Sequence, residues 1–321
     1  MIWTASNETN LKTMDCSVKP LVAHYDLKRP CDWSGVFGRK APLTVEIGFG
    51  LGEVLTQKAL EAPGVNFIGI ETHWERIYKT LKRIQREGAE TQNNIRILRL
   101  DATPALKRLF GQETIDEMYC LFPCPWPKKK HIKHRLFSKE SLRLINSRLK
   151  DKSRLSIVTD YFPYFEWIKE ESRGCGFKVE AKQANPGFNT KFERKWRGEG
   201  QETFFELAMT KIKHVNVPVE ADVPLKTYTV DTFDPKKFVL EAHKGEAAVV
   251  FKELLFDADK QLALVHVLVA EEHLTQDFWA AIVKTNKGWL IKKADGHYFF
   301  PTPGIAQALK SVYQAAKQAK R

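Results

Sequence analysis

Residues 43–52 read Leu43-Thr44-Val45-Glu46-Ile47-Gly48-Phe49-Gly50-Leu51-Gly52. The first five are apolar or β-branched apart from Glu46, which is typical of a buried strand. The three glycines that follow let the backbone pass close to a ligand, because glycine has no Cβ. Residues 53–62 then read as a helix, which Pro63-Gly64 ends. We therefore predict a first strand–helix unit whose glycine turn, residues 48–52, approaches a ligand.

The same alternation of strand and helix continues along the chain. We predict further strands at residues 66–70, 95–100, 115–121, 155–159, 177–184 and 203–210. Helices are predicted at residues 74–87, 103–110 and 162–173, and another begins after Ser138, a residue type that caps helices. Strands that alternate with helices form parallel βαβ units. The predicted fold class is therefore α/β, with a Rossmann-like, doubly wound and mostly parallel sheet.

Acidic side chains stand at or next to the carboxyl ends of four predicted strands, namely Glu46, Glu71, Asp101 and Asp160. Ligands of doubly wound sheets bind at this edge. A carboxylate placed there is costly unless it meets a ligand or water. Four of them in register therefore indicate a binding site.

The glycine turn is compatible with two kinds of nucleotide cofactor. A dinucleotide site has the order G-x-G-x-x-G and seats a pyrophosphate on the helix N-terminus. Here the third glycine comes one residue early and Glu53 follows it, so a pyrophosphate would be repelled. The order E-x-G-x-G-x-G in residues 46–52 resembles instead the first motif of class I S-adenosylmethionine-dependent methyltransferases. Glu46 suits that cationic cofactor, Glu71 can accept from ribose hydroxyls, and Asp101 can accept from the adenine amine.

A second distinctive stretch reads Leu121-Phe122-Pro123-Cys124-Pro125-Trp126-Pro127-Lys128-Lys129-Lys130-His131-Ile132-Lys133-His134-Arg135. Its prolines cannot donate to a strand ladder, so a loop begins where the strand at 115–121 ends. A basic run alone is usually a solvated surface. Together with the stiff proline backbone and an aromatic ring, it favours a nucleic-acid or phosphate site. No metal is expected, because the spacing of Cys124, His131 and His134 matches no common zinc pattern.

Composition favours a cytoplasmic protein with a polyanionic partner. The formal net charge is +12, and residues 213–321, with 15 Lys+Arg and 13 Asp+Glu, hold only +2 of it. The five cysteines are an odd number without a C-x-x-C pair, which fits a reducing compartment. Neither a signal-peptide pattern nor an apolar run long enough to span a bilayer is visible, so no membrane partner is expected.

Residues from about 30 to 211 resemble the bacterial tRNA (guanine-N7-)-methyltransferases, which modify a guanine of the tRNA variable loop. The matching segments are Glu46–Gly52, Gly69–Glu71, Leu100–Ala102, Phe122–Lys128, Thr159–Asp160 and Thr190–Glu193. The resemblance implies a tRNA (guanine(46)-N7)-methyltransferase that uses S-adenosylmethionine and binds tRNA. It implies cofactor contacts at Glu46, Gly48, Gly50, Gly52, Glu71, Asp101 and Cys124. It implies contacts with tRNA or guanine at Lys128, Lys130, His131, Lys133, His134, Arg135, Asp160, Thr190, Lys191, Phe192 and Glu193.

One position departs from the family pattern. Cys124 stands where the family has Asp, the proposed catalytic residue. Guanine N7 carries a lone pair and no proton, so methyl transfer needs no general base in the usual sense. Orientation and proximity can supply about 7–11 kcal/mol of the barrier. We therefore expect an active enzyme with Cys124 and Asp160 as candidate catalytic residues, in which Asp160 and Glu193 supply acceptors and Cys124 contributes weakly.

Two other classes of function compete with this interpretation. The first is a catalytically weakened RNA-binding homologue that lost the reaction with Cys124. The second is a small-molecule methyltransferase or a nicotinamide oxidoreductase. Glu53 speaks against the second, and so does a second basic cluster on a loop, made of Lys191, Arg194, Lys195 and Arg197.

The resemblance does not extend securely to residues 213–321. Pro218 and Pro224 punctuate a connector, so we expect a methyltransferase domain with an N-terminal extension at 1–212 and an accessory domain at 213–321. Apolar runs at 249–256 and 262–270 flank a turn, which predicts a hairpin. Residues 278–283 read as a strand or a helix, and residues 305–319 as an amphipathic helix. These elements predict a smaller α+β domain of unknown role, and the sequence leaves open a monomer or a homodimer.

Overall fold

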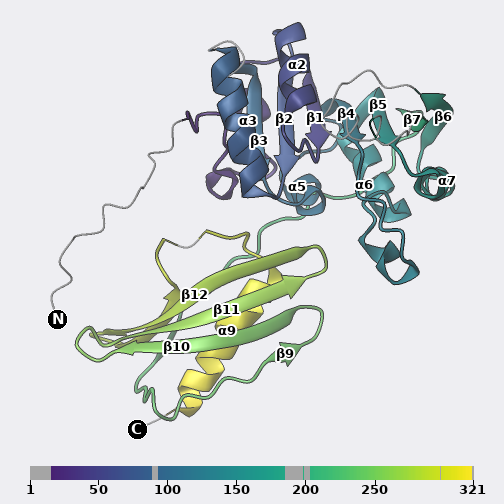
Figure 1. Ribbon diagram of the computed structural model, residues 1–321. Coiled ribbons are helices and arrows are strands. Elements are labelled where there is room, and N and C mark those ends of the chain that lie inside the picture. The colour runs from purple at the N-terminus through teal and green to yellow at the C-terminus, as the bar shows by residue number, and fades with distance from the viewer. Residues whose placement is uncertain (1–15, 89–92, 185–197, 199–202, 297, 320–321) are drawn as a thin grey trace. The chain divides into compact units, whose positions relative to one another are not determined.

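The computed structural model describes residues 16–88, 93–184, 198, 203–296 and 298–319. The chain divides into two compact units, which Figure 1 shows. The first unit comprises Met1–His24 and Pro30–Val219, and the second comprises Tyr25–Arg29 and Glu220–Arg321. The second unit therefore takes in a short segment from near the start of the chain.

The first unit is built on a seven-stranded sheet in the order β3-β2-β1-β4-β5-β7-β6. Its strands are β1 (Leu43–Ile47), β2 (Asn66–Glu71), β3 (Ile95–Arg99), β4 (Ile115–Leu121), β5 (Leu149–Thr159), β6 (Phe177–Ala184) and β7 (Phe204–Lys211). Strands β1 to β5 pair in parallel, whereas β7 is antiparallel to β5 and to β6. This arrangement confirms the predicted doubly wound, mostly parallel α/β fold.

Helices connect the parallel strands. They are α2 (Glu53–Glu61), α3 (Trp74–Glu87), α5 (Ala102–Arg108), α6 (Lys139–Arg148) and α7 (Phe162–Glu171), with η1 (His24–Asp26) and α1 (Trp33–Phe37) before β1 and η2 (Lys129–His134) after β4. Helices α2 and α3 lie side by side (Figure 1) and share one buried apolar cluster, which includes Leu55 and Leu81. The cap predicted at Ser138 is confirmed, because its Oγ accepts the Ser141 N–H at 3.3 Å.

Strand β5 is longer than the sequence predicts. Residues 155–159 are recognised by their apolar pattern, but the strand begins at Leu149, which pairs with Ile115 at the start of β4. Residues 150–152 are charged and exposed, so their composition carries no strand signal. Leu149 pairs with β4 ahead of a register shift, and the pairing resumes at Arg154, so contacts with β4 on both sides of the charged residues extend the strand.

The position of β1 fixes where a ligand can bind. Strand β1 has β2 on one side and β4 on the other, so the order of strands reverses beside it. In doubly wound sheets a crevice forms at such a point, outside the carboxyl ends of the strands. The glycine turn begins where β1 ends, and the proline-rich stretch begins where β4 ends. Both segments therefore start at the edge that receives the ligand.

In its described residues, the second unit is an antiparallel sheet packed with helix α9 (Pro303–Gln318). Its strands follow the order β8-β13-β12-β11-β10-β9 and are β8 (Tyr228–Val230), β9 (His243–Lys244), β10 (Ala248–Asp257), β11 (Leu262–Glu271), β12 (Leu274–Thr285) and β13 (Gly288–Lys293). Helix α9 buries Ile305, Leu309 and Val312 in a core with Val265 and Val267 of β11. The predicted hairpin and terminal helix are confirmed, and residues 278–283 belong to a strand.

Among the described residues, no helix has both the length and the apolar character that crossing a membrane requires.

Candidate functional site

The turn after β1 depends on its glycines. Gly48, Gly50 and Gly52 have φ angles of 70°, 57° and 67°, a left-handed conformation that other residues rarely adopt. At Gly52 a Cβ atom would also lie 2.3 Å from Thr80 Cγ2 of α3. The same helix holds the turn by hydrogen bonds, because Thr80 Oγ1 and Arg83 Nε donate to its carbonyls at 3.5 and 3.3 Å. The turn is therefore fixed in place by α3.

A pocket of about 530 Å³ opens at this edge of the sheet. Its lining comes from Glu46 of β1, from the glycine turn, from the first two residues of α2, from residues 121–125 at the end of β4 and after it, from residues 160–161 after β5 and from Arg76 of α3. This volume is typical of a site for a small molecule. Of the cofactor and catalytic residues predicted from the sequence, the pocket lining includes Glu46, Gly48, Gly50, Cys124 and Asp160.

Glu46 is an almost completely buried carboxyl on the pocket lining. Its side chain, in β1, is 3% exposed, and the Tyr119 hydroxyl donates to its Oε2 at 3.1 Å. Burial raises the pKa of Glu46 to about 8, against the opposing effects of the Tyr119 hydrogen bond and the charge of Lys58. A cation entering the pocket would favour the charged carboxylate. Glu46 is thus suited to a cationic ligand.

Glu71 lies beside the pocket, and in the described part of the chain it is not among the lining residues. Its Oε1 accepts the backbone N–H groups of Thr72 and His73 at 2.9 and 3.0 Å, and its Oε2 accepts the Gly50 N–H at 3.2 Å and Arg76 Nη1 at 3.3 Å. Burial raises the pKa of Glu71, but the hydrogen bonds and the Arg76 charge outweigh it, so this pKa is lowered. Glu71 therefore joins the glycine turn to the start of α3.

Asp101 also has a role within the fold. It is the N-cap of α5, and its side chain accepts the Thr103 N–H at 2.9 Å. As the structure describes the chain, Asp101 does not line the pocket. Contact of Glu71 or Asp101 with a cofactor stays a prediction.

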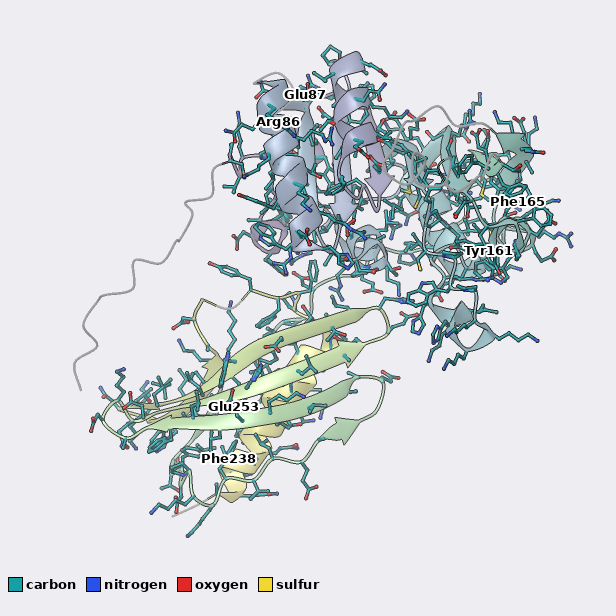
Figure 2. All side chains as sticks on the ribbon, in the orientation of Figure 1. Arg86, Glu87, Tyr161, Phe165, Phe238 and Glu253 are labelled. Atoms are coloured by element: carbon teal, nitrogen blue, oxygen red, sulfur yellow. The ribbon has the colours of Figure 1, made fainter. Side chains whose placement is uncertain are left out.

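Cys124 and Asp160 reach the pocket from two neighbouring strands. Cys124 is exposed in the loop after β4, and Asp160 follows β5 directly and is half-buried. Burial raises the pKa of Asp160. Tyr161, the next residue and labelled in Figure 2, directly precedes α7. It also lines the pocket. Three carboxyl side chains therefore line the pocket: Glu46 is buried, Glu53 Oε1 lies 3.8 Å from Arg83 Nη2, and Asp160 is half-buried.

Residues 128–134, termed the cationic rim, follow the proline-rich stretch. Lys129–His134 form η2, and the side chains of Lys128, Lys129, Lys130, Lys133 and His134 are exposed. The Trp126 ring packs on the rim, with its centroid 5.6 Å from that of His131 and 5.3 Å from that of His134. The lysines of the rim are thus free to meet a polyanion in solution.

Arg135 lies differently from the prediction that it contacts RNA. Its side chain is buried, with 8% exposure, and its Nε donates to the Pro125 carbonyl at 2.9 Å. The guanidinium lies 5.1 and 4.9 Å from the ring centroids of Tyr164 and Trp167. A side chain enclosed in this way does not present its charge to a nucleic acid. The sequence did not reveal this, because Arg135 ends a run of otherwise exposed cations.

The predicted guanine contacts Thr190, Lys191, Phe192 and Glu193 lie outside the described residues. The same holds for the second basic cluster at Lys191, Arg194, Lys195 and Arg197. Their roles stay predictions.

Arg76 and Tyr161 line the pocket, and the sequence interpretation did not include them. Arg76 stands with Thr80 and Arg83 at i, i+4 and i+7 of α3, which is a polar stripe beside the apolar face of that helix. That spacing was a usable signal. The sequence signal for Tyr161 is weaker: it is an aromatic residue directly after a carboxylate at a strand end.

The lining fits S-adenosylmethionine by its chemistry. That molecule carries a sulfonium and an ammonium group, and the pocket offers the carboxyls of Glu46 and Asp160. It has no phosphate, and Glu53 at the first position of α2 would repel a phosphate from that helix N-terminus.

Comparison with known proteins points to one family. Residues 40–206 match the family described as "Putative methyltransferase". A tRNA (guanine-N(7)-)-methyltransferase of Chlorobium phaeobacteroides is 43% identical over 173 residues, which cover 54% of this chain and 83% of that protein. Proteins of the same name from Thermus thermophilus and Thermotoga maritima are 31% and 28% identical, and these comparisons cover 89% and 91% of this chain and 91% and 96% of those proteins.

These last two comparisons cover about nine tenths of the chain, so they include much of residues 220–321. The likeness is therefore not confined to the first unit. The chain belongs to the tRNA (guanine-N(7)-)-methyltransferase family, and it is an enzyme whose cosubstrate is S-adenosylmethionine.

Proposed function

We propose that this enzyme transfers the methyl group of S-adenosylmethionine to N7 of guanine 46 in the variable loop of tRNA. The observation that carries the proposal is the continuity of an acidic pocket with a cationic surface on one loop. Cys124 and Pro125 line the pocket, and the cationic rim begins at Lys128. The names of the relatives from Chlorobium, Thermus and Thermotoga support the same reaction.

The chemistry requires little proton transfer from the protein. S-adenosylmethionine supplies an electrophilic methyl group on a sulfonium. The lone pair of guanine N7 forms the new bond to the methyl carbon as the sulfur–carbon bond breaks, and no proton leaves N7. The protein aligns the reactants, which is the larger part of its work. Asp160 and Cys124 meet the guanine, and Asp160 stabilises the positive charge that the purine gains.

The remaining contacts divide by chemistry. On the cofactor side, Glu46 faces the cation, and Gly48, Gly50 and Gly52 allow a close backbone approach. Glu71 and Asp101 serve the ribose and the adenine. On the tRNA side, Lys128, Lys130, Lys133, His131 and His134 contact the phosphate backbone, and Thr190–Glu193 complete the guanine site. Binding carried by such phosphate contacts weakens as salt rises.

We also place the reaction in the cytoplasm. In the structure, Cys16, Cys31, Cys120, Cys124 and Cys175 are not joined in disulfides. Free thiols are at home in a reducing compartment.

The test is transfer of a labelled methyl group to tRNA transcribed without modifications, followed by strand cleavage at 7-methylguanine. We expect label at one variable-loop guanine and none when adenine replaces that guanine. A chain that binds S-adenosylmethionine and tRNA but transfers no label would be the weakened RNA-binding homologue. Label at another nucleotide would refute the proposed position.

A further inference from the structure

The loop between β4 and α6 has few internal supports for its backbone. Phe122 and Trp126 have φ angles of 55° and 43°, a strained conformation for residues with a side chain. Three prolines in the stretch cannot donate backbone hydrogen bonds. The Phe122 N–H donates to the Val158 carbonyl at 2.7 Å, which holds only the start of the loop. Further along, the His131 N–H donates to the Lys128 carbonyl at 2.8 Å within η2, so the part that relies most on side chains to keep its shape is the stretch between Pro123 and Pro127.

Arg135 provides such a support at the far end of the loop. Its backbone N–H donates to the Ile132 carbonyl at 3.0 Å, which closes η2. Its Nε then reaches back across the loop to the Pro125 carbonyl at 2.9 Å. One residue therefore fixes both the end of the cationic rim and the end of the pocket wall.

Aromatic side chains of α7 hold Arg135 in turn. The guanidinium carbon lies 5.1 Å from the Tyr164 ring centroid and 4.9 Å from the Trp167 ring centroid. Tyr164 is fully buried, so this support is anchored in the core. Helix α7 also follows Asp160 and Tyr161, which line the pocket. Arg135 thus connects the two segments that bring Cys124 and Asp160 to the pocket.

A lysine would not reproduce these contacts. A guanidinium is planar, stacks on aromatic rings and donates from Nε at a fixed angle, whereas an ammonium group is a compact and strongly hydrated charge. The geometry at position 135 therefore uses the shape of arginine and not only its charge.

We propose that Arg135 is a positioning residue, which holds the pocket wall at Cys124–Pro125 and the cationic rim in register with Asp160. This inference rests on the proposed function in one respect: the register it maintains is that between guanine N7 and the methyl donor. Arg135 itself contacts neither tRNA nor cofactor.

The experiment compares Arg135→Lys, Arg135→Ala and Trp167→Leu with the full-length wild type. All rates are normalised to the folded fraction measured by circular dichroism. We expect kcat to fall about 100-fold in Arg135→Ala, because a misplacement of about 1 Å can cost that much. In Arg135→Lys, kcat should fall nearly as far, although this variant keeps the positive charge. Trp167→Leu, which leaves Arg135 in place, should change kcat in the same direction.

Salt dependence separates positioning from direct contact. Arg135→Lys and Arg135→Ala should leave the slope of log K for tRNA against log salt unchanged, because no phosphate contact is lost. The exposed neighbour Lys130 gives the contrast, since Lys130→Ala should reduce the slope by about 1. A reduced slope in Arg135→Ala would make Arg135 a phosphate contact and overturn the proposal.

Trypsin gives a readout that does not depend on methyl transfer. The rim carries several lysines, so a loosened loop should be cleaved faster at residues 128–133 in each variant, while cofactor binding measured by calorimetry weakens. Wild-type kcat and wild-type trypsin resistance in Arg135→Lys would refute the positioning role. If the wild type itself methylates no tRNA, the proposed function fails, and trypsin cleavage still decides the role of Arg135.

Discussion

Cys124 combines two properties that matter for methyl transfer. It is exposed in the pocket that Asp160 also lines, and it stands between two prolines that restrict the backbone. A neutral thiol is a weak hydrogen-bond acceptor and stabilises a developing positive charge poorly. A carboxylate at the same place would do both. The identity of this one side chain should therefore set the rate and not the fold.

The substitution Cys124→Asp is expected to raise kcat for tRNA methylation by about tenfold or more, since preorganised electrostatic groups contribute on this scale or above. Cys124→Ser is the matched control, because it is similar in size and neutral, and it should give no such gain. Single-turnover methyl transfer measures both. A fall in turnover for Cys124→Asp would show that Cys at this position is no handicap.

Glu46 makes stability depend on pH in a direction that can be worked out. Burial raises its pKa from 4.5 to about 8 in the folded chain. Between these values the unfolded chain ionises the carboxyl while the folded chain keeps the proton. The contribution of Glu46 to stability is therefore fully present below pH 4.5 and is lost as pH rises to about 8.

Glu46→Gln should remove this dependence. In the cofactor-free wild type, the free energy of unfolding measured with urea should fall by up to about 1.4 kcal/mol per pH unit between the two pKa values, and in the variant this fall should be absent. The variant should be more stable than the wild type at pH 8.5 and should bind S-adenosylmethionine more weakly. Equal pH profiles for the two proteins would mean that Glu46 is already ionised in the fold.

At the scale of elements, α3 does two tasks with two stripes of residues. One stripe, Ile77, Leu81 and Ile84, is buried in the core. The other, Arg76, Thr80 and Arg83, holds the glycine turn and the Glu71 carboxylate. The turn that approaches the cofactor is therefore positioned by a helix that follows the next strand along the chain.

Gly52→Ala tests this packing. A Cβ there would meet Thr80 at 2.3 Å on a backbone with φ of 67°, so we expect a loss of about 1–3 kcal/mol in unfolding free energy and weaker cofactor binding. Adding Thr80→Ala removes the contacts with Thr80 Cγ2 and Oγ1 at 2.3 and 2.7 Å, so it should recover part of the loss, while the contact with the Cβ at position 80 at 3.0 Å and the backbone strain remain. Gly64→Ala is the control, because a Cβ there meets nothing within 4 Å, and its effect should stay below about 0.5 kcal/mol. A neutral Gly52→Ala would disprove the close contact.

The elements that the sequence predicted well carry strong local signals. Strand β1 is apolar or β-branched apart from Glu46 and is followed directly by a glycine, and α6 starts at a serine cap, so local chemistry decides both. Strand β12 was ambiguous, because the apolar residues 278–283 suit a strand or a helix and the pairing with β11 decides between them. The antiparallel pairing of β7 likewise depends on contacts distant in sequence.

The sequence predicted which residues belong to the site better than it predicted what each of them contacts. The pocket lining includes Glu46, Cys124 and Asp160, as the strand ends indicated. The sequence could not show that Glu71 is held by Arg76 and Gly50, or that Arg135 turns inward while its neighbours face solvent. Both outcomes depend on which partners the fold brings within hydrogen-bond distance.

At the scale of the whole molecule, the second unit is completed by a segment that precedes the first sheet. Arg29 forms an ion pair with Asp222, lies 4.8 Å from the Phe300 ring centroid, and donates to the Tyr25 carbonyl at 3.0 Å. Tyr25 also packs on Tyr298 and Phe300. Residues 25–29 are thus part of the second unit, although each of them is exposed or only partly buried.

Arg29→Ala is expected to destabilise the second unit by about 1–3 kcal/mol, because it leaves polar partners without their donor. Hydrogen exchange across residues 274–293 should speed up, while exchange in β1 and β4 stays near wild type. Lys28→Ala, at an exposed neighbouring position, should change neither. Faster exchange confined to the first unit would contradict the assignment of residues 25–29 to the second.

The pairing of Arg29 with Asp222, 193 residues later, has a consequence for how the protein is made. A ribosome adds roughly 5–20 residues per second, so Arg29 emerges on the order of ten to forty seconds before its partner. Throughout that interval residues 25–29 of the nascent chain lack the residues with which they pair in the folded protein. A gene fragment that encodes only residues 220–321 would therefore yield a polypeptide that lacks the segment to which Asp222 and Phe300 are joined.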